Sequence, residues 1–223
     1  MSLTVHFLCS YYSHRAHLEV AQRSPSLWDA YMFCKAVKTR TINGYCTVPS
    51  TPPEEINQNN VVRARQLFGA YIRHTLGDET FGSAYFVPVP SKDSFDNPEF
   101  RSFTMLRESL TNAGPDRIIP AVSFTSPLGK ASEGGPRGYS NMFPHLSVNR
   151  IPPGPIVLVD DILTSGGTML ATKDRLVQAG ANVVCAVVCG KTTSSLEPGF
   201  KLRTFELDDH TGSFDIDISE LDW

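Results

Sequence analysis

Residues 156–168, which read IVLVDDILTSGGT, constrain the fold of this chain more than any other stretch. Four apolar residues are followed by two adjacent aspartates, two more apolar residues and a turn of small residues. A short, wholly apolar run is typical of a strand that is buried on both faces, as in a parallel sheet. Paired glycines before a threonine favour a tight turn into a helix. The stretch therefore predicts a strand–turn–helix unit of an α/β fold.

The turn in this stretch has the chemistry of a phosphomonoester site. Its residues, which combine three hydroxyls with two glycines, are Thr164, Ser165, Gly166, Gly167 and Thr168. The glycines allow the backbone to approach a ligand closely, and the start of the following helix adds N–H groups and a partial positive charge. Asp160 and Asp161 precede the turn, where their carboxylates can accept hydrogen bonds from sugar hydroxyls. These residues together predict a ribose-5-phosphate site.

The stretch resembles the 5-phosphoribosyl-1-pyrophosphate (PRPP) motif of type I phosphoribosyltransferases, in which an apolar run, two acids and a Thr/Ser–Gly–Gly–Thr turn occur in this order. The resemblance implies a parallel sheet flanked by helices, a site at the carboxyl ends of the strands, and a homodimer. It implies that Asp160 and Asp161 contact the ribose hydroxyls and that residues 164–168 hold the 5′-phosphate. Phosphoribose would pass from PRPP to a nitrogen nucleophile, a small-molecule acceptor, with release of pyrophosphate.

The resemblance also implies Mg²⁺ as the cofactor. The ion would be held chiefly by PRPP oxygens and water, because Mg²⁺ dehydrates reluctantly, with Asp160 as a candidate protein ligand.

Thr164 narrows the choice of acceptor. Family members that salvage 6-oxopurines place an aspartate at this position, and a hydroxyl cannot replace a carboxylate that handles a proton. We therefore expect no hypoxanthine–guanine activity. The loop is more similar to the adenine, orotate or competence-associated branches of the family.

A second segment, residues 84–92 (AYFVPVPSK), predicts a strand that ends at prolines. By resemblance to the family, Ser91 would offer a backbone N–H and Lys92 an ammonium to the leaving pyrophosphate. The proline pair also resembles the competence-protein-F-like branch, in which an Arg–Gly–Phe–Asn–Gln stretch follows. Arg101 and Phe103 lie at a comparable spacing here, whereas the residues beside them differ.

Residues 126–149 are rich in glycine and proline and predict a mobile hood that closes over the site and excludes water. Within the hood, Lys130 and Arg137 are candidates to neutralise the charge of the departing pyrophosphate. The alternative interpretation of this segment is an ordinary surface loop that contains two cations.

The remaining pattern alternates strands and helices. A polar, proline-rich connector at residues 49–60 divides the chain into two parts. Residues 1–60 are expected to form an N-terminal extension or to join the hood, and residues 61–223 to form the phosphoribosyltransferase-like domain. Strands are expected at residues 84–89, 118–124, 156–159, 183–188 and 203–207. Helices are expected at residues 27–37, 61–76, 103–111 and 167–179, the last ending at Gly180.

Composition excludes several other classes of protein. The 20 basic and 23 acidic residues give a net charge of −3, which argues against a nucleic-acid or membrane-surface binder. No stretch approaches the roughly 20 apolar residues of a membrane span, and we expect a cytoplasmic protein. The five cysteines are an odd number and predict reduced thiols. Among them, Cys185 and Cys189 are expected to be small buried residues of one strand and not a disulfide.

Weaker motifs point elsewhere. Residues 190–192 (GKT) imitate the end of a P-loop but lack its upstream glycine, and His14 and His17 have helical spacing without further metal ligands. Two functional alternatives remain. The first is a non-catalytic protein that senses PRPP or a nucleotide on the same fold. The second is a docking role for the aromatic residues of the first 60 positions, although such residues more often form core.

Overall fold

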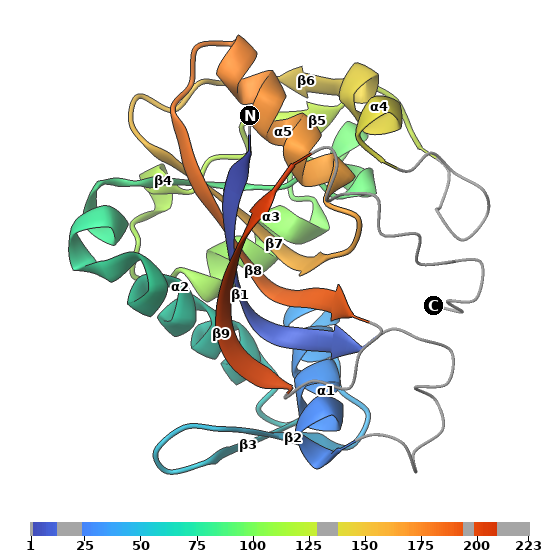
Figure 1. Ribbon diagram of the computed structural model, residues 1–223, viewed down its shortest axis with the longest axis vertical. Helices are drawn as coiled ribbons and strands as arrows, with labels where there is room; N and C mark the ends of the chain where they lie inside the picture. The colour runs from blue at the N-terminus through green and yellow to red at the C-terminus, as the bar shows by residue number, and fades with distance from the viewer. Residues whose placement is uncertain (1, 13–23, 129–137, 194–198, 209–223) are drawn as a thin grey trace.

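The computed structural model describes residues 2–12, 24–128, 138–193 and 199–208. Its centre is a five-stranded sheet with the order β4-β7-β8-β1-β9 (Figure 1). Adjacent strands are parallel except at the edge, where β9 runs antiparallel to β1. The strands are β1 (Leu3–Tyr12), β4 (Tyr85–Pro88), β7 (Ile156–Leu163), β8 (Val183–Thr193) and β9 (Phe200–Leu207). The predicted α/β fold, a mostly parallel sheet flanked by helices, is confirmed.

Helices cover both faces of the sheet. On one face, α1 (Pro25–Thr39), α2 (Val62–Ser83) and α3 (Arg101–Ser109) share a hydrophobic core with Val157 and Val159 of β7. On the other face, α5 (Gly167–Gln178) shares a second core with Ile156 and Leu158. Alternate residues of β7 thus enter opposite cores, which is why this strand reads as a continuous apolar run.

The ends of two helices follow from their local sequence. The side chain of Ser24 caps α1 by accepting a hydrogen bond from the backbone N–H of Leu27 (3.3 Å), and Pro25 occupies the first turn. Past the end of α5, Gly180 adopts a φ of 92°, a conformation that favours glycine. The prediction that Gly180 terminates this helix is confirmed.

Smaller elements lie outside the main sheet. The first two-stranded sheet joins β2 (Tyr45–Val48) to β3 (Glu54–Asn57), and the second joins β5 (Val122–Phe124) to β6 (Leu146–Val148). A short helix, α4 (Tyr139–Met142), precedes β6. The 3₁₀ turns are η3 (Lys92–Phe95), η4 (Pro115–Arg117) and η6 (Phe143–His145).

The structure corrects the predicted N-terminal extension. β1 pairs with β8 on one side and with β9 on the other, so the first residues of the chain lie inside the sheet. In β1, Leu3, Val5 and Phe7 are buried in the same core as α5. The expected connector at residues 49–60 contains β3. Residues 1–60 and the following segment therefore share one sheet and its cores, while a hood role for residues 1–60 stays a prediction.

Three expected elements differ in extent. β5 covers only the end of the strand expected at residues 118–124, because Ile118 forms an isolated bridge to Phe86 and β5 pairs with β6 instead. Residues 126–149, expected to be a loop, contain α4 and β6. β8 continues to Thr193, so residues 190–192 lie within a strand, which agrees with the rejection of a P-loop.

None of the described helices combines the length and the apolar composition that a membrane crossing requires. All five cysteines are buried as free thiols, and Cys185 and Cys189 enter the same core, as expected. His14 and His17 lie outside the described residues.

Candidate functional site

The carboxyl ends of β4, β7, β8 and β1 lie at one edge of the sheet because these strands are parallel (Figure 1). The segment after β4 is placed beside the acidic end of β7, since the backbone N–H of Val89 donates to the carbonyl of Val159 (2.9 Å). Open α/β sheets bind ligands at this edge. The fold therefore brings together the two segments that the sequence predicted as phosphate-binding.

The strand β7 is longer than predicted. It ends at Leu163, so both aspartates are strand residues and do not follow the strand. The end of β7 is held by β8, because the hydroxyl of Thr192 donates to the carbonyl of Leu163 (3.2 Å). The aspartates are thus fixed by the sheet, and only residues 164–166 form the connection to α5.

The two glycines of the turn are required by close packing. Gly166 adopts a φ of 75°, the left-handed region, and caps α5. A Cβ atom at Gly167 would lie 2.5 Å from the carbonyl carbon of Gly138 and 2.7 Å from the backbone N of Tyr139. Gly167 is thus needed for contact with the chain that leads into α4. The hydroxyl-bearing residues of the turn are each half-buried: Thr164, Ser165 and Thr168.

The two aspartates have different environments. The side chain of Asp161 is 4% exposed and forms an ion pair with Arg101, the first residue of α3. Asp160 remains partly accessible, and its Oδ1 accepts a hydrogen bond from the backbone N–H of Asp161 (2.8 Å). The sequence predicted two equivalent carboxylates for the ribose. In the structure one carboxylate is engaged by an arginine, and Asp160 is the more accessible of the two.

Burial and the neighbouring Asp161 carboxylate raise the pKa of Asp160 from 3.8 to about 8, against the opposing effect of Arg101. The folded protein therefore retains a proton on Asp160 at neutral pH. A protonated carboxyl can donate as well as accept a hydrogen bond, which suits it to a sugar hydroxyl.

This shift makes stability depend on pH. Between about pH 4 and pH 8 the folded chain holds a proton that the unfolded chain has released, so the free energy of unfolding falls as the pH rises. Asp160→Asn removes the effect, and we expect the variant to exceed the wild type by about 1–3 kcal/mol at pH 8, with the gain shrinking towards pH 5. Urea unfolding at several pH values measures this. Asp78→Asn, at a side chain that is 81% exposed, is the control. A gain that is equal at pH 5 and pH 8 would contradict the assignment.

Residues in and next to the predicted pyrophosphate loop form hydrogen bonds that position the first residue of α3. The hydroxyl of Ser91 donates to Asp93 (2.5 Å), which also accepts the backbone N–H of Arg101 (2.9 Å). Although burial opposes ionisation, these hydrogen bonds lower the pKa of Asp93. Lys92 is half-buried at the start of η3. Ser91 and Lys92 therefore lie at the predicted edge of the sheet, with the Ser91 side chain used to position Arg101.

Arg101 and Asp93 belong to this arrangement but were not among the predicted site residues. The sequence carried one signal for Arg101, its spacing from the proline pair. The sequence gave no indication of a role for Asp93, because the turn η3 brings this side chain to the residues that it contacts. The two predicted hood cations, Lys130 and Arg137, lie outside the described residues.

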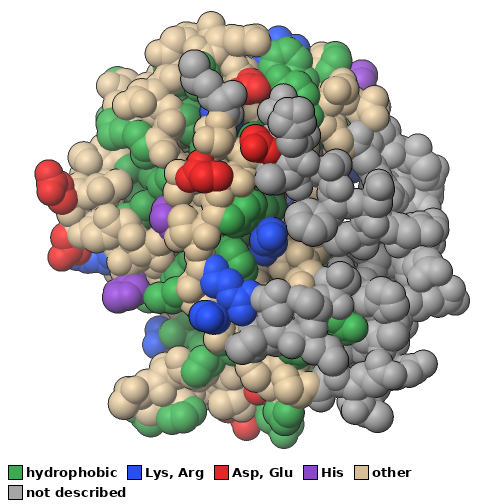
Figure 2. Space-filling model, in the orientation of Figure 1, with side chains coloured by type: hydrophobic (Ala, Val, Ile, Leu, Met, Phe, Trp, Pro, Cys, Tyr) green, Lys and Arg blue, Asp and Glu red, His purple; other side chains and the backbone are tan. Residues whose placement is uncertain are grey.

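Further positive charge lies on the face of the sheet that α5 covers in part. Figure 2 shows Lys and Arg side chains gathered in the middle of the visible face, over β9 and its neighbours. Basic residues of these strands are Lys191, Lys201 and Arg203. The ammonium of Lys191 lies 4.4 Å from the ring centroid of Phe205, and Lys191 is paired in register with Leu163, next to the turn. Of these three residues, Lys191 is the one that the strand register places beside the turn.

Residues 151–215 match the model of the phosphoribosyl transferase domain. Over 73 residues the chain is 40% identical to the hypoxanthine/guanine phosphoribosyltransferase of Methanocaldococcus infernus. The aligned part covers 30% of this chain and 39% of the relative's length.

Three solved structures are similar at low identity. An adenine phosphoribosyltransferase gives a TM-score of 0.40 at 18% identity, covering 71% of this chain and 89% of that one. The Saccharomyces cerevisiae adenine phosphoribosyltransferase gives 0.37 at 18%, covering 71% and 88%. The Mycobacterium tuberculosis orotate phosphoribosyltransferase gives 0.36 at 16%, covering 74% and 87%.

Proposed function

Because residues 151–215 match the model of the phosphoribosyl transferase domain, we propose that this chain is a phosphoribosyltransferase. It would use PRPP and Mg²⁺ and transfer phosphoribose to a nitrogen nucleophile in nucleotide salvage or related metabolism. The C1–O bond to pyrophosphate breaks, positive charge develops at C1 of the ribose, and the nucleophile forms the new C1–N bond.

The observation that carries this proposal is the junction of β7 and α5. Three features meet where β7 ends: Gly166 in a left-handed conformation, half-buried hydroxyls, and the start of the 12-residue helix α5. Phosphate groups bind at such junctions. In the proposal, Thr164, Ser165 and Thr168 donate hydrogen bonds to the 5′-phosphate.

The acids take separate roles in this proposal. Asp160 contacts a ribose hydroxyl, since it is partly accessible. Asp161 acts through Arg101, which it holds at the edge of the sheet where Ser91 and Lys92 are also found. There the guanidinium and the ammonium oppose the negative charge of the leaving pyrophosphate. Lys130 and Arg137 remain candidates for the same task.

Mg²⁺ would fit the donor set at this edge once its charge displaces the proton of Asp160, because Asp160 then offers a partly accessible carboxylate oxygen beside a second acid. When bound, the ion would neutralise part of the pyrophosphate charge. Most of its ligands would come from PRPP and water.

The acceptor stays open. Thr164 in place of an aspartate argues against 6-oxopurines, whereas the Methanocaldococcus infernus relative is named for hypoxanthine and guanine. A panel of acceptors should therefore contain adenine and orotate together with both 6-oxopurines. The competence-protein-F branch, the cytoplasmic location and the homodimer also stay predictions.

A second candidate function is that of a PRPP or nucleotide sensor without turnover. The ion pair between Asp161 and Arg101 favours it, because it withdraws one of the two carboxylates from the ribose. Neither candidate calls for a nucleic-acid or membrane partner.

Pyrophosphate release distinguishes the two candidates. With PRPP, Mg²⁺ and the acceptor panel, we expect release that depends on one acceptor. Calorimetry gives PRPP affinity independently, and Thr168→Val should weaken it about tenfold or more, because it removes a hydrogen bond to a charged group. Thr204→Val, on the exposed side of β9, is the control. Binding without release would select the sensor, and the absence of both would exclude both candidates.

A further inference from the structure

Three buried cysteines from distant parts of the chain converge in the core that α1 shares with the sheet. They are Cys9 of β1, Cys34 of α1 and Cys189 of β8, and each is 0% exposed. Their three sulfur atoms all lie within 4.8 Å of one another, and the Sγ atoms of Cys34 and Cys189 are 3.8 Å apart. The other two cysteines, Cys46 and Cys185, are also buried but lie outside this group. The three converging residues form what is named here the thiol cluster.

Two local features bring these three side chains together. Phe7 enters the core that contains α5, whereas Cys9, two residues later, enters the opposite core. Residues two apart on a regular strand share a face, and the pairing of β1 with β9 is irregular between these two residues. Gly190 pairs with Cys9, and a Cβ atom at Gly190 would lie 2.6 Å from the Sγ of Cys34. The missing side chain at Gly190 therefore lets the Cys34 thiol reach the strands.

The spacing of the sulfur atoms fits a single metal ion with three ligands. A metal–thiolate bond is about 2.3 Å long, so three sulfur atoms around one ion lie about 4 Å from one another. The Sγ atoms of Cys34 and Cys189 already have nearly this separation, at 3.8 Å. Binding would therefore require only small movements of the three side chains.

The donor set favours a soft ion of low coordination number. Thiolates prefer Cu⁺, Zn²⁺ and iron–sulfur clusters to Mg²⁺ or Ca²⁺. Structural Zn²⁺ and iron–sulfur clusters take four protein ligands, and Zn²⁺ with three protein ligands adds a water. In the described part of the chain, no fourth ligand atom of a His, Cys, Asp or Glu residue joins the thiol cluster, and its members are closed to solvent. Cu⁺ is satisfied by three sulfur atoms, so it fits this cluster best.

The ion has to displace thiol protons. Burial raises the pKa of Cys9 and that of Cys189, so both residues keep their protons when no metal is bound. These protons leave to solvent as the copper–sulfur bonds form. A buried thiolate is tolerated when it coordinates a metal. No electron is transferred, because copper enters as Cu⁺ and remains Cu⁺.

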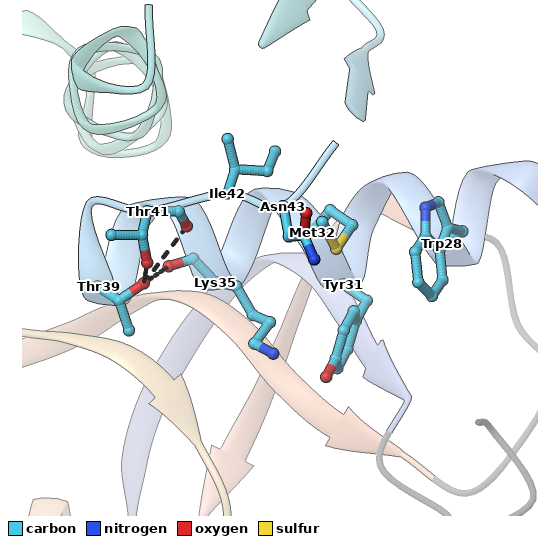
Figure 3. Close-up of a pocket in the computed structure, with 8 residues that line it drawn as sticks. All are labelled: Trp28, Tyr31, Met32, Lys35, Thr39, Thr41, Ile42 and Asn43. Carbon is cyan, nitrogen blue, oxygen red and sulfur yellow. Dashed lines mark hydrogen bonds between the residues drawn. The ribbon is translucent and has the colours of Figure 1, made fainter. Parts of the chain in front are cut away.

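Packed side chains close the route from solvent to the thiol cluster. Tyr31 and Lys35 extend from the same side of α1, where a hollow of about 430 Å³ lies (Figure 3). Cys34, between them in sequence, is instead buried in the core. The ring of Tyr31 stacks on that of Tyr11 with 5.0 Å between centroids, and the Cβ of Tyr11 adjoins Gly190. An ion reaches the cluster only when such core side chains move, so we expect slow loading of the folded chain.

We propose that Cys9, Cys34 and Cys189 bind one Cu⁺ ion as a structural site. The ion would link β1, α1 and β8, which carry the three ligands. Structural metal sites have every position filled by protein, whereas catalytic sites keep one position open. The closed thiol cluster is of the structural kind. The proposal stands whether or not the chain transfers phosphoribose.

Copper loading of the full-length reduced chain tests the proposal without any substitution. The protein is incubated without oxygen with Cu⁺ and Zn²⁺ together, and a Cu⁺ chelator then removes weakly bound copper. We expect native mass spectrometry to show one copper per chain and no zinc, and X-ray absorption to show three sulfur neighbours at about 2.3 Å. Retention of zinc in place of copper, or copper with nitrogen or oxygen neighbours, would overturn the proposal. So would a chain that has lost two thiols to a disulfide and holds no copper.

Variants locate the copper by competition with the same chelator. Cys34→Ala should weaken Cu⁺ binding by more than about a hundredfold, because residues that only orient metal ligands already contribute about 10–100-fold. Cys185→Ala is the matched control, since Cys185 is a buried thiol of the same strand as Cys189 but lies outside the cluster. It should keep the affinity of the wild type.

Stability provides a second measurement on these variants. Copper should raise the urea midpoint of the wild type and of Cys185→Ala, but not that of Cys34→Ala, because a ligand stabilises only the state that binds it. Circular dichroism checks folding, and Cys9→Ala takes the place of Cys34→Ala if that variant does not fold. Copper affinity that is equal in the cluster variant and in Cys185→Ala would overturn the proposal.

Discussion

Arg101→Ala is expected to lower the free energy of unfolding by about 2–4 kcal/mol, because it leaves the carboxylate of Asp161 buried without its partner. The range is reduced for the 37% exposure of the Arg101 side chain, which lets solvent screen part of the interaction. The same variant should lose pyrophosphate release, since the proposed function assigns the guanidinium to the leaving group. Urea unfolding measures the stability, and an assay for pyrophosphate measures the release.

A matched control lies on the same helix. Arg107 pairs with Glu99 at 2.6 Å, but the two side chains are 53% and 59% exposed, so Arg107→Ala should cost less than about 1 kcal/mol. In the double variant Arg101→Met with Asp161→Asn, both charges are absent, and much of the lost stability should return. If Arg101→Ala costs no more than Arg107→Ala, the buried pair does not stabilise the fold as inferred.

Gly167→Ala is expected to weaken PRPP binding by more than about tenfold and to lower stability by about 1–3 kcal/mol. The added Cβ would lie within 2.5–2.7 Å of backbone atoms of Gly138 and Tyr139, and a backbone cannot rotate away as a flexible side chain can. Either α5 or the chain before α4 must shift, and the hydroxyls of the turn would move with α5. Calorimetry with PRPP and urea unfolding give the two effects separately.

Gly82 of α2 provides the control for this substitution. A Cβ atom at Gly82 would meet nothing within 4 Å, so Gly82→Ala should leave PRPP affinity unchanged and stability equal or slightly higher. The stability loss in Gly167→Ala does not depend on the identity of the ligand. If Gly167→Ala is as stable as the wild type, the inferred packing is wrong. If the variant is destabilised but the wild type itself does not bind PRPP, only the proposed function is wrong.

The strand–turn–helix unit could be predicted from the sequence because the residues that determine it are close together in the chain. The apolar run of β7, the glycines of the turn and Gly180 after α5 each act on the backbone within a few residues. Parallel strands bring their carboxyl ends to one edge, so the meeting of the β4 and β7 segments also followed from the predicted fold class.

Other features depended on contacts between residues far apart in the chain. β1 pairs with β8 and β9, which lie near the other end of the sequence. No local pattern in the sequence indicates such pairing, so the proline-rich residues 49–60 predicted a domain boundary. Likewise, Asp160 and Asp161 are chemically identical neighbours, but strand geometry turns successive side chains to opposite faces. Only Asp161 meets Arg101, and this tertiary contact gives the two carboxylates different environments and different proposed roles.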